Sequence, residues 1–211
     1  HTGRISRAPD LPVALPVPLS LVAGGRLWVV GARNREERGQ MLSIGPGETA
    51  WRREPDALPH MWAIPGVSLD DKLYVCVPET GLAVFDPVAA RWSVVPGPTK
   101  PRSAQIAAWR GEIWIMGGCD IADWSETWIY APSSRTWRPG PSLPAQLAWG
   151  TAAVLDDQLV VTGGAGIHQG PGNRTYEFSD RTFVLASADI PPAQPVAQGR
   201  PLPRWNDVKL R

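Results

Sequence analysis

The strongest constraint on this chain is an internal repeat. An apolar strand, a tight turn and a second apolar strand recur four times, and an aromatic residue is expected to close each copy. The second strands open at Leu27, Leu73, Ile113 and Leu159, which gives a period of 46, 40 and 46 residues. Self-similarity at such a period is typical of solenoids, propellers and arrays, whose units bury their apolar faces against one another.

The third copy shows the unit most clearly. Residues 104–109 and 112–116 read as two strands around the turn Arg110-Gly111, and the pair Gly117-Gly118 follows them. Residues 127–130 and 135–137 read as two further short strands. Short β-prone runs between Gly, Pro, Asp and Ser predict antiparallel meanders of four strands. The corresponding turns of the other copies are expected at Gly24-Gly25, Asp70-Asp71 and Asp156-Asp157, and the closing aromatics at Trp51, Trp92, Trp137 and Phe183.

The fourth copy is expected to use residues 175–178 as its next strand, and residues 183–186 would then begin a fifth unit. A phrase near the end of the chain, Leu202 to Trp205, repeats the phrases Leu58 to Trp62 and Leu143 to Trp149 that introduce earlier copies. The sequence therefore predicts four units and the opening of a fifth.

Composition narrows the classes of partner. The chain has 211 residues, and its 21 basic and 20 acidic residues leave a net charge of +1, so we expect neither a nucleic-acid nor a membrane partner. No apolar run approaches the roughly 20 residues that span a bilayer. Cys76 and Cys119 are expected to be free thiols in a cytoplasmic protein, although a bond between adjacent units and secretion both stay open because the sequence begins at His1.

Two stretches carry a resemblance to a known family. Gly117-Gly118 through Tyr130 to Trp137, and Phe85-Asp86-Pro87 through Trp92, resemble the Kelch repeat. The resemblance implies an all-β fold, a Kelch-type β-propeller with four-stranded antiparallel blades. One propeller over residues 1–211, or part of a larger one, is expected, and another chain or segment would then complete the ring. The repeats are placed at about 17–57, 58–98, 99–143 and 144–190, with a partial copy at 191–211.

Catalytic chemistry finds little support in the sequence. The histidines, His1, His60 and His168, have no metal-ligand spacing, and no glycine-rich loop precedes a helix. The pairs Asp70-Asp71 and Asp156-Asp157 suggest acid–base work, yet both fall in hairpin turns, where Asp satisfies backbone groups. We therefore predict no catalytic residue, no metal and no cofactor, and regard an enzyme as the less favoured class.

The resemblance also implies where a partner would bind. In Kelch propellers, the loop after the double glycine and the loop before the first strand open on one face. The first class holds Arg33, Asn34, Asp120 and His168, and the second holds Trp62, Arg102, Ser103 and Trp149. Trp62, Trp149 and Trp205 are interpreted as sharing one repeat position. The alternative is that these tryptophans pack inside the propeller.

The function implied is recognition without catalysis. The module is expected to bind a protein or peptide through one rim, with Arg33 and Arg102 pairing acidic groups and Trp62 and Trp149 holding apolar ones. The alternative is a carbohydrate-directed module, a lectin or an enzyme similar to sialic-acid mutarotases, because stacked tryptophans beside Arg, Asp and His also suit a sugar.

Overall fold

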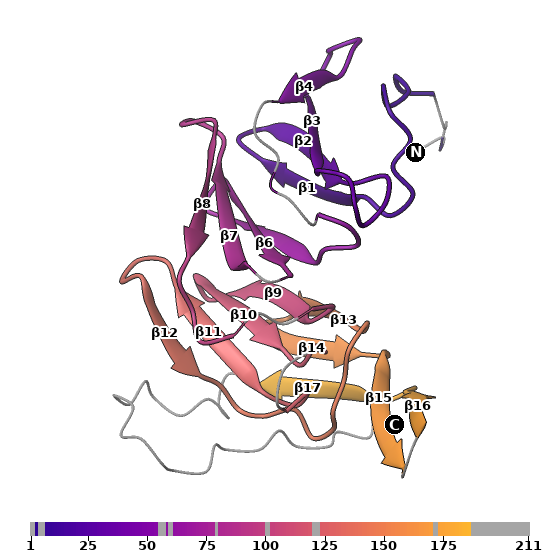
Figure 1. Cartoon of the computed structure of the whole chain (residues 1–211). Coiled ribbons are helices and arrows are strands. Elements are labelled where there is room, and N and C mark those ends of the chain that lie inside the picture. The colour runs from indigo at the N-terminus through magenta and orange to yellow at the C-terminus, as the bar shows by residue number, and fades with distance from the viewer. Residues whose placement is uncertain are drawn as a thin grey trace.

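Four antiparallel sheets, one for each repeat, follow one another along the chain and form an arc, and a separate two-stranded hairpin accompanies the last of them (Figure 1). The computed structural model describes residues 3, 7–54, 58, 61–78, 80–99, 102–119, 123–170 and 173–186. Within these ranges the regular elements are strands. The expected partial copy at 191–211, with Trp205, lies outside the described residues.

The first three sheets each have four strands in sequence order. The first contains β1 (Leu19–Ala23), β2 (Arg26–Gly31), β3 (Gln40–Ile44) and β4 (Arg52–Glu54). The second contains β5 (Gly66–Leu69), β6 (Lys72–Val77), β7 (Gly81–Asp86) and β8 (Arg91–Val95). The third contains β9 (Gln105–Trp109), β10 (Glu112–Met116), β11 (Thr127–Ala131) and β12 (Thr136–Pro139). The expectation of four-stranded antiparallel meanders is confirmed for these three units.

The fourth sheet differs from the sequence interpretation. It contains β13 (Thr151–Leu155), β14 (Gln158–Thr162) and β17 (Thr182–Ala186), while β15 (Ala165–Gly170) and β16 (Asn173–Phe178) form a separate hairpin. The assignment of residues 175–178 to this sheet was therefore wrong, and Phe183 neither closes the unit nor begins a fifth one. Phe183 lies opposite Val161 and is fully buried. Phe183 and Leu185 alternate along β17 and are both buried, so pairing this strand with β14 removes their apolar surface from water.

The predicted hairpin turns are confirmed in all four units. Both central residues of each turn have positive φ angles, from 48° at Asp156 to 75° at Gly111. Two successive left-handed residues match the right-handed twist of the flanking strands, and Gly and Asp tolerate them better than most residues. The second Asp also joins neighbouring sheets: Asp71 accepts a hydrogen bond from Gly24 N at 2.9 Å, and Asp157 accepts one from Trp109 Nε1 at 2.9 Å.

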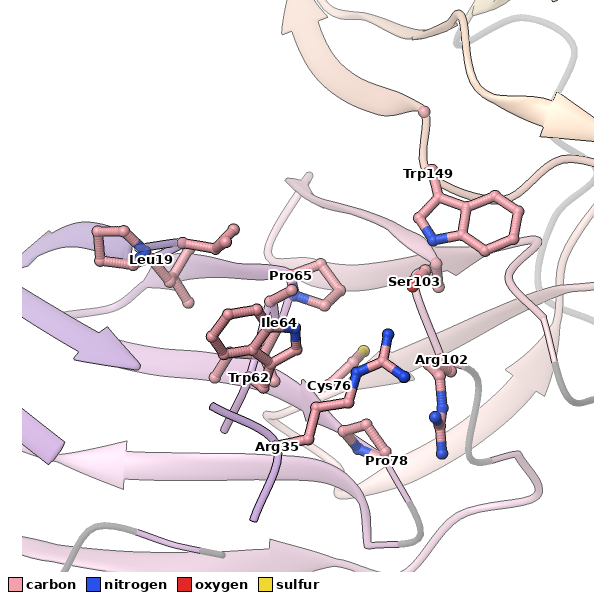
Figure 2. A pocket seen from close by; sticks show the side chains of 15 residues that line it. Leu19, Arg35, Trp62, Ile64, Pro65, Cys76, Pro78, Arg102, Ser103 and Trp149 are labelled. Carbon is pink, nitrogen blue, oxygen red and sulfur yellow. The ribbon is translucent and has the colours of Figure 1, made fainter. Parts of the chain in front are cut away.

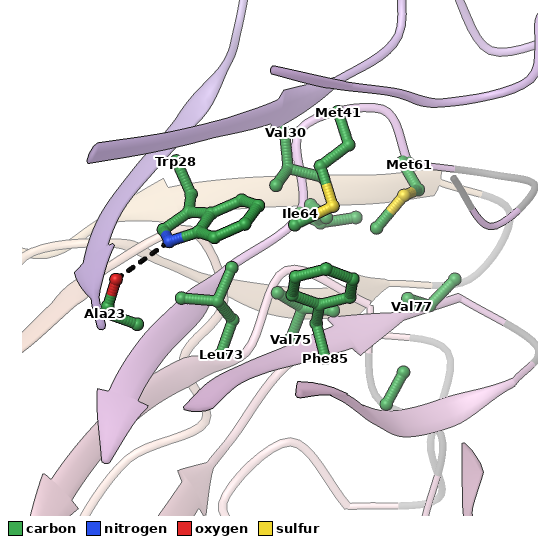
Figure 3. Close-up of a cluster of buried hydrophobic side chains, with 11 residues drawn as sticks. Ala23, Trp28, Val30, Met41, Met61, Ile64, Leu73, Val75, Val77 and Phe85 are labelled. Atoms are coloured by element: carbon green, nitrogen blue, oxygen red, sulfur yellow. Dashed lines mark hydrogen bonds between the residues drawn. The ribbon is translucent and has the colours of Figure 1, made fainter. Parts of the chain in front are cut away.

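The core lies between the sheets, because each strand sends alternate side chains to its two neighbours. The first strands of adjacent sheets, β1, β5, β9 and β13, contact one another in sequence order. Figure 3 shows the cluster between the first two sheets, where Trp28 from β2 meets Phe85 from β7 at a ring separation of 5.1 Å. Equivalent clusters fill the spaces between the second and third sheets and between the third and fourth.

The closing tryptophans of three units pack as expected from the sequence. Trp92 lies opposite Phe85, and Trp137 lies opposite Tyr130, with ring separations of 5.2 and 5.0 Å. The indole of Trp137 also donates a hydrogen bond to Pro96 O, at the end of the preceding sheet, at 2.7 Å. The indole of Trp51 donates to Pro9 O at 2.9 Å in the same way. These tryptophans join each unit to the segment before it.

Candidate functional site

The loops after the second strands and the segments leading into the first strands meet at one end of the propeller. Gly118 N, after β10, donates a hydrogen bond to Leu147 O, ahead of β13, at 2.8 Å. Gly117 has a φ of 60°, and a Cβ at this position would lie 2.3 Å from the same carbonyl oxygen. Only glycine fits there without a shift of the backbone. We call this end of the molecule the mouth.

Equivalent positions of the four units reach the mouth together. Val17, Ala63, Ser103 and Trp149 each stand seven residues before the first residue of their hairpin turn. The last three have left-handed backbones, with φ angles of 50°, 56° and 60°. A bulky residue such as Trp rarely adopts this conformation, and such strained positions gather at ligand sites. The mouth thus holds four equivalent residues, one from each unit, and three of them have an unfavourable backbone conformation.

A cavity of about 390 Å³ opens at the mouth (Figure 2). Trp62 and Arg35 lie on one side of it, and Trp149, Ser103 and Arg102 lie on the other. All four units contribute to its wall: Val17, Pro18, Leu19 and Arg35 from the first, Trp62 to Pro65, Cys76 and Pro78 from the second, Arg102 to Ala104 from the third, and Trp149 and Gly150 from the fourth. The cavity therefore requires the assembled propeller.

The wall of the cavity is apolar and positively charged. Among the described residues that line it, Arg35 and Arg102 are the charged ones and none is acidic. Arg35 is exposed, and no carboxylate of the described chain forms an ion pair with it. Cys76 also reaches the wall, but burial raises the pKa of its thiol to about 12, so it stays neutral near pH 7. This chemistry suits an anionic group flanked by apolar surface.

Trp149 is the most exposed aromatic side chain of the wall, at 51%. Its backbone N donates a hydrogen bond to Ser103 O at 2.9 Å, which fixes the loop beside the third unit. Its ring makes edge contacts with Trp124 and with Tyr176, at centroid separations of 6.0 and 5.4 Å. Three rings from two units thus form a row at the rim, and half of the central ring stays open to a ligand.

Half of the rim residues expected from the sequence meet at this cavity: Trp62, Arg102, Ser103 and Trp149. Arg33 and Asn34 do not line it, because both bond to Glu37 of their own loop, at 2.7 and 2.9 Å. His168 lies in β15, opposite Thr175, and Asp120 lies outside the described residues.

The expected equivalence of Trp62 and Trp149 is wrong by one position. The strand registers align Trp149 with Ala63 and Ser103, whereas Trp62 aligns with Arg102. The sequence prediction aligned one tryptophan with another across a loop of variable length, which concealed the shift of one residue. Counting back from the hairpin turns gives the alignment without ambiguity.

Three residues that the sequence analysis overlooked complete the site. Arg35, rather than Arg33, reaches the cavity from the loop after β2. Trp124 supports Trp149 from the loop that follows the double glycine, and Tyr176 supports it from the β15–β16 hairpin. The position of Trp124 in a mouth loop was a signal present in the sequence, but the hairpin was concealed by its misassigned pairing.

In the part of the chain that the structure describes, no group of three His, Cys, Asp or Glu residues could hold a metal ion. Over the same residues, there is no helix with the length and apolar character needed to cross a membrane.

Comparison with known proteins identifies the repeat. The chain is 36% identical over 86 residues to Kelch-like protein 33 of Homo sapiens, which covers 39% of this chain and 16% of that protein. It is 31% identical over 119 residues to beta-scruin of Limulus polyphemus, covering 51% of this chain and 13% of that protein. The chain thus matches less than a fifth of the length of these two relatives. No protein-family model matches it.

A solved structure shares the fold. The structure of YjhT superposes with a TM-score of 0.65 at 15% identity, over 81% of this chain and 68% of that one. Together with the sheets, these matches define the fold as a Kelch-type β-propeller. The two sequence matches and the shared fold support assignment of the repeats to the Kelch family. Protein interaction is the typical role of such repeats, which agrees with the class of function expected from the sequence.

Proposed function

We propose that this propeller recognises a segment of a partner protein at its mouth. The observation that carries the proposal is the cavity of about 390 Å³, which equivalent positions of all four units build together. A site formed this way gives one partner segment simultaneous contact with four units. Propellers offer such sites because their loops converge while the sheets hold them rigid.

The residues of the wall suggest what the segment carries. Arg35 and Arg102 provide planar, permanently charged donors that suit a carboxylate in two-point contact. Trp62 and Trp149 provide large apolar surfaces next to these charges. Tryptophan and arginine are enriched among the residues that dominate binding energy. An acidic side chain with an apolar neighbour is the ligand that this wall would favour.

A carbohydrate is the second candidate, and the exposure of Trp149 favours it. An indole face open to solvent beside arginines could stack on a sugar ring while the guanidinium groups bind its polar groups. The volume of the cavity also falls within the roughly 300–1,000 Å³ of small-molecule sites. The two candidates need the same mouth residues and differ in the ligand.

The test begins with peptides selected from a random phage-displayed library on the intact chain. The recovered peptides are then titrated by fluorescence anisotropy against Trp149→Ala and Arg35→Glu. Each variant is expected to weaken binding by about 30-fold, as for a residue worth about 2 kcal/mol. Arg135→Glu and Leu155→Ala serve as matched controls, because both residues are exposed at turns on the opposite end of the sheets.

The result separates the two candidates. Selected peptides that bind Trp149→Ala and Arg35→Glu as tightly as the unmodified chain would show that the mouth is not their site. A fluorescence change on titration with a panel of sugars, abolished by Trp149→Ala, would instead support the carbohydrate candidate.

A further inference from the structure

The fourth unit carries an additional element at the mouth. The β15–β16 hairpin leaves the sheet after Gly163-Gly164, and the chain returns to the sheet at β17 (Figure 1). Ala165, its first residue, exchanges backbone hydrogen bonds with Ala148 at 2.9 and 2.8 Å. The described parts of the first three units have no such hairpin between their second and third strands. The hairpin is therefore anchored beside Trp149.

The hairpin places two aromatic rings in solvent next to Trp149. Tyr176 and Phe178, two residues apart on one face of β16, are 53% and 87% exposed, and Trp149 is 51% exposed. Among the aromatic side chains whose exposure the structure describes, these three are the exposed ones; Tyr176 contacts Trp149, and Phe178 lies two residues further along the same strand. We call Trp149, Tyr176 and Phe178 the aromatic ridge.

The fold does not account for the ridge. The clusters between the sheets are filled without it, and Phe178 in particular gives up little of its surface to packing. A contiguous group of exposed rings beside a cavity is a feature of binding surfaces, because leaving such apolar area in water is unfavourable.

We propose that the aromatic ridge extends the mouth and binds the apolar part of an extended acidic peptide segment of a partner protein. This inference rests on the proposed function and adds a second half to its site. The acidic side chain of the segment enters the cavity, where the guanidinium group of Arg35 is exposed at the wall. The apolar side chains of the segment lie on Tyr176 and Phe178.

The spacing of the ridge favours an extended peptide as its ligand. Alternate residues of a strand lie on the same side at intervals of about 7 Å. Tyr176 and Phe178 are such alternate residues, and an extended peptide alongside them would present its own apolar side chains at the same interval. We therefore expect a ligand sequence with an acidic residue and, separated from it, two apolar residues with one residue between them.

The test uses the selected peptides in a double-mutant cycle. Tyr176→Ser and Phe178→Ser are titrated with a selected peptide and with the same peptide after its two alternate apolar residues are changed to Ser. Each variant is expected to weaken the original peptide by about tenfold and the serine peptide by less than twofold. Leu155→Ser is the matched control, because Leu155 is also exposed, at 65%, but lies at the far end of β13.

The outcomes distinguish the two proposals. If Tyr176→Ser and Phe178→Ser weaken the binding of both peptides equally, or of neither, the proposal for the aromatic ridge is overturned. A strong effect of Arg35→Glu on the same peptides would still support the mouth as a binding site. No effect of either set of variants would overturn both. Co-sedimentation with phosphatidylcholine vesicles that Phe178→Ser abolishes would assign the ridge to a membrane surface and overturn the peptide proposal.

Discussion

Replacing Gly117 by alanine tests how the mouth is held together. Gly117 lies at the end of β10, is buried, and has a φ of 60°. A Cβ there would lie 2.3 Å from Leu147 O and 2.8 Å from Trp124 O, both of them backbone atoms that cannot rotate away. Gly111 offers a matched control, because its φ is 75° and a Cβ would meet nothing within 4 Å.

The two substitutions share one destabilising effect, and Gly117→Ala has a second one. The left-handed backbone disfavours alanine by about 1–2 kcal/mol at both positions. Only at Gly117 must the segment around Leu147 also move, which breaks the 2.8 Å hydrogen bond from Gly118 N to Leu147 O. A buried donor left without its acceptor costs about 1–3 kcal/mol. We expect Gly117→Ala to lower the free energy of unfolding by about 2 kcal/mol more than Gly111→Ala does.

Urea unfolding followed by tryptophan fluorescence measures this difference directly, since both variants retain every tryptophan. In a thermal melt the same difference corresponds to a Tm about 4–8 °C lower for Gly117→Ala. Because Leu147 leads to Trp149, peptide binding should also weaken in this variant alone. Equal destabilisation by the two substitutions would refute the argument that close approach of the next unit requires glycine.

Three other measurements test parts of the fold. Contacts with Arg26 lower the pKa of Glu48 from 4.5 to about 2. This pair therefore stabilises the fold fully above pH 4.5 and loses that contribution as the pH falls toward 2. Glu48→Gln should reduce the drop in the urea unfolding midpoint that acid causes. Trp137→Phe removes the hydrogen bond to Pro96 O and should lower the unfolding free energy by about 1 kcal/mol, and an unchanged urea midpoint would contradict this role. Cys76 is 1% exposed, so a thiol reagent should modify it only on unfolding, whereas rapid labelling of the native protein would show that the cavity wall opens.

The sequence was a good guide to the fold wherever local rules decide the outcome. The four turns followed from short polar pairs between apolar runs, because these positions require left-handed residues. Trp92 and Trp137 were recognised as closing residues from their position in the repeat, and in the structure each pairs with an aromatic of the adjacent strand. The prediction of the third strand failed for the fourth unit, because the runs at 175–178 and 182–186 both contain aromatic residues and both read as strands. Only competition for a place in the core selects between them.

The candidate site was harder to predict. Membership of a mouth loop could be inferred from repeat position, which brought Trp62, Arg102, Ser103 and Trp149 to one cavity. The direction of a side chain within an exposed loop could not be inferred from the sequence. The prediction therefore named Arg33, whereas Arg35 is the residue that reaches the wall of the cavity. Arg33 instead bonds to Glu37, four residues along the same loop, an interaction that a sequence pattern does not distinguish from many others.

The sequence by itself determined the repeat and the all-β class. Those properties depend on interactions between residues close along the chain, which a periodic pattern records directly. Tertiary structure alone decided that an inserted hairpin brings Tyr176 to Trp149. That contact joins residues more than 20 positions apart in the sequence, where three-dimensional packing, rather than local pattern, selects the neighbours.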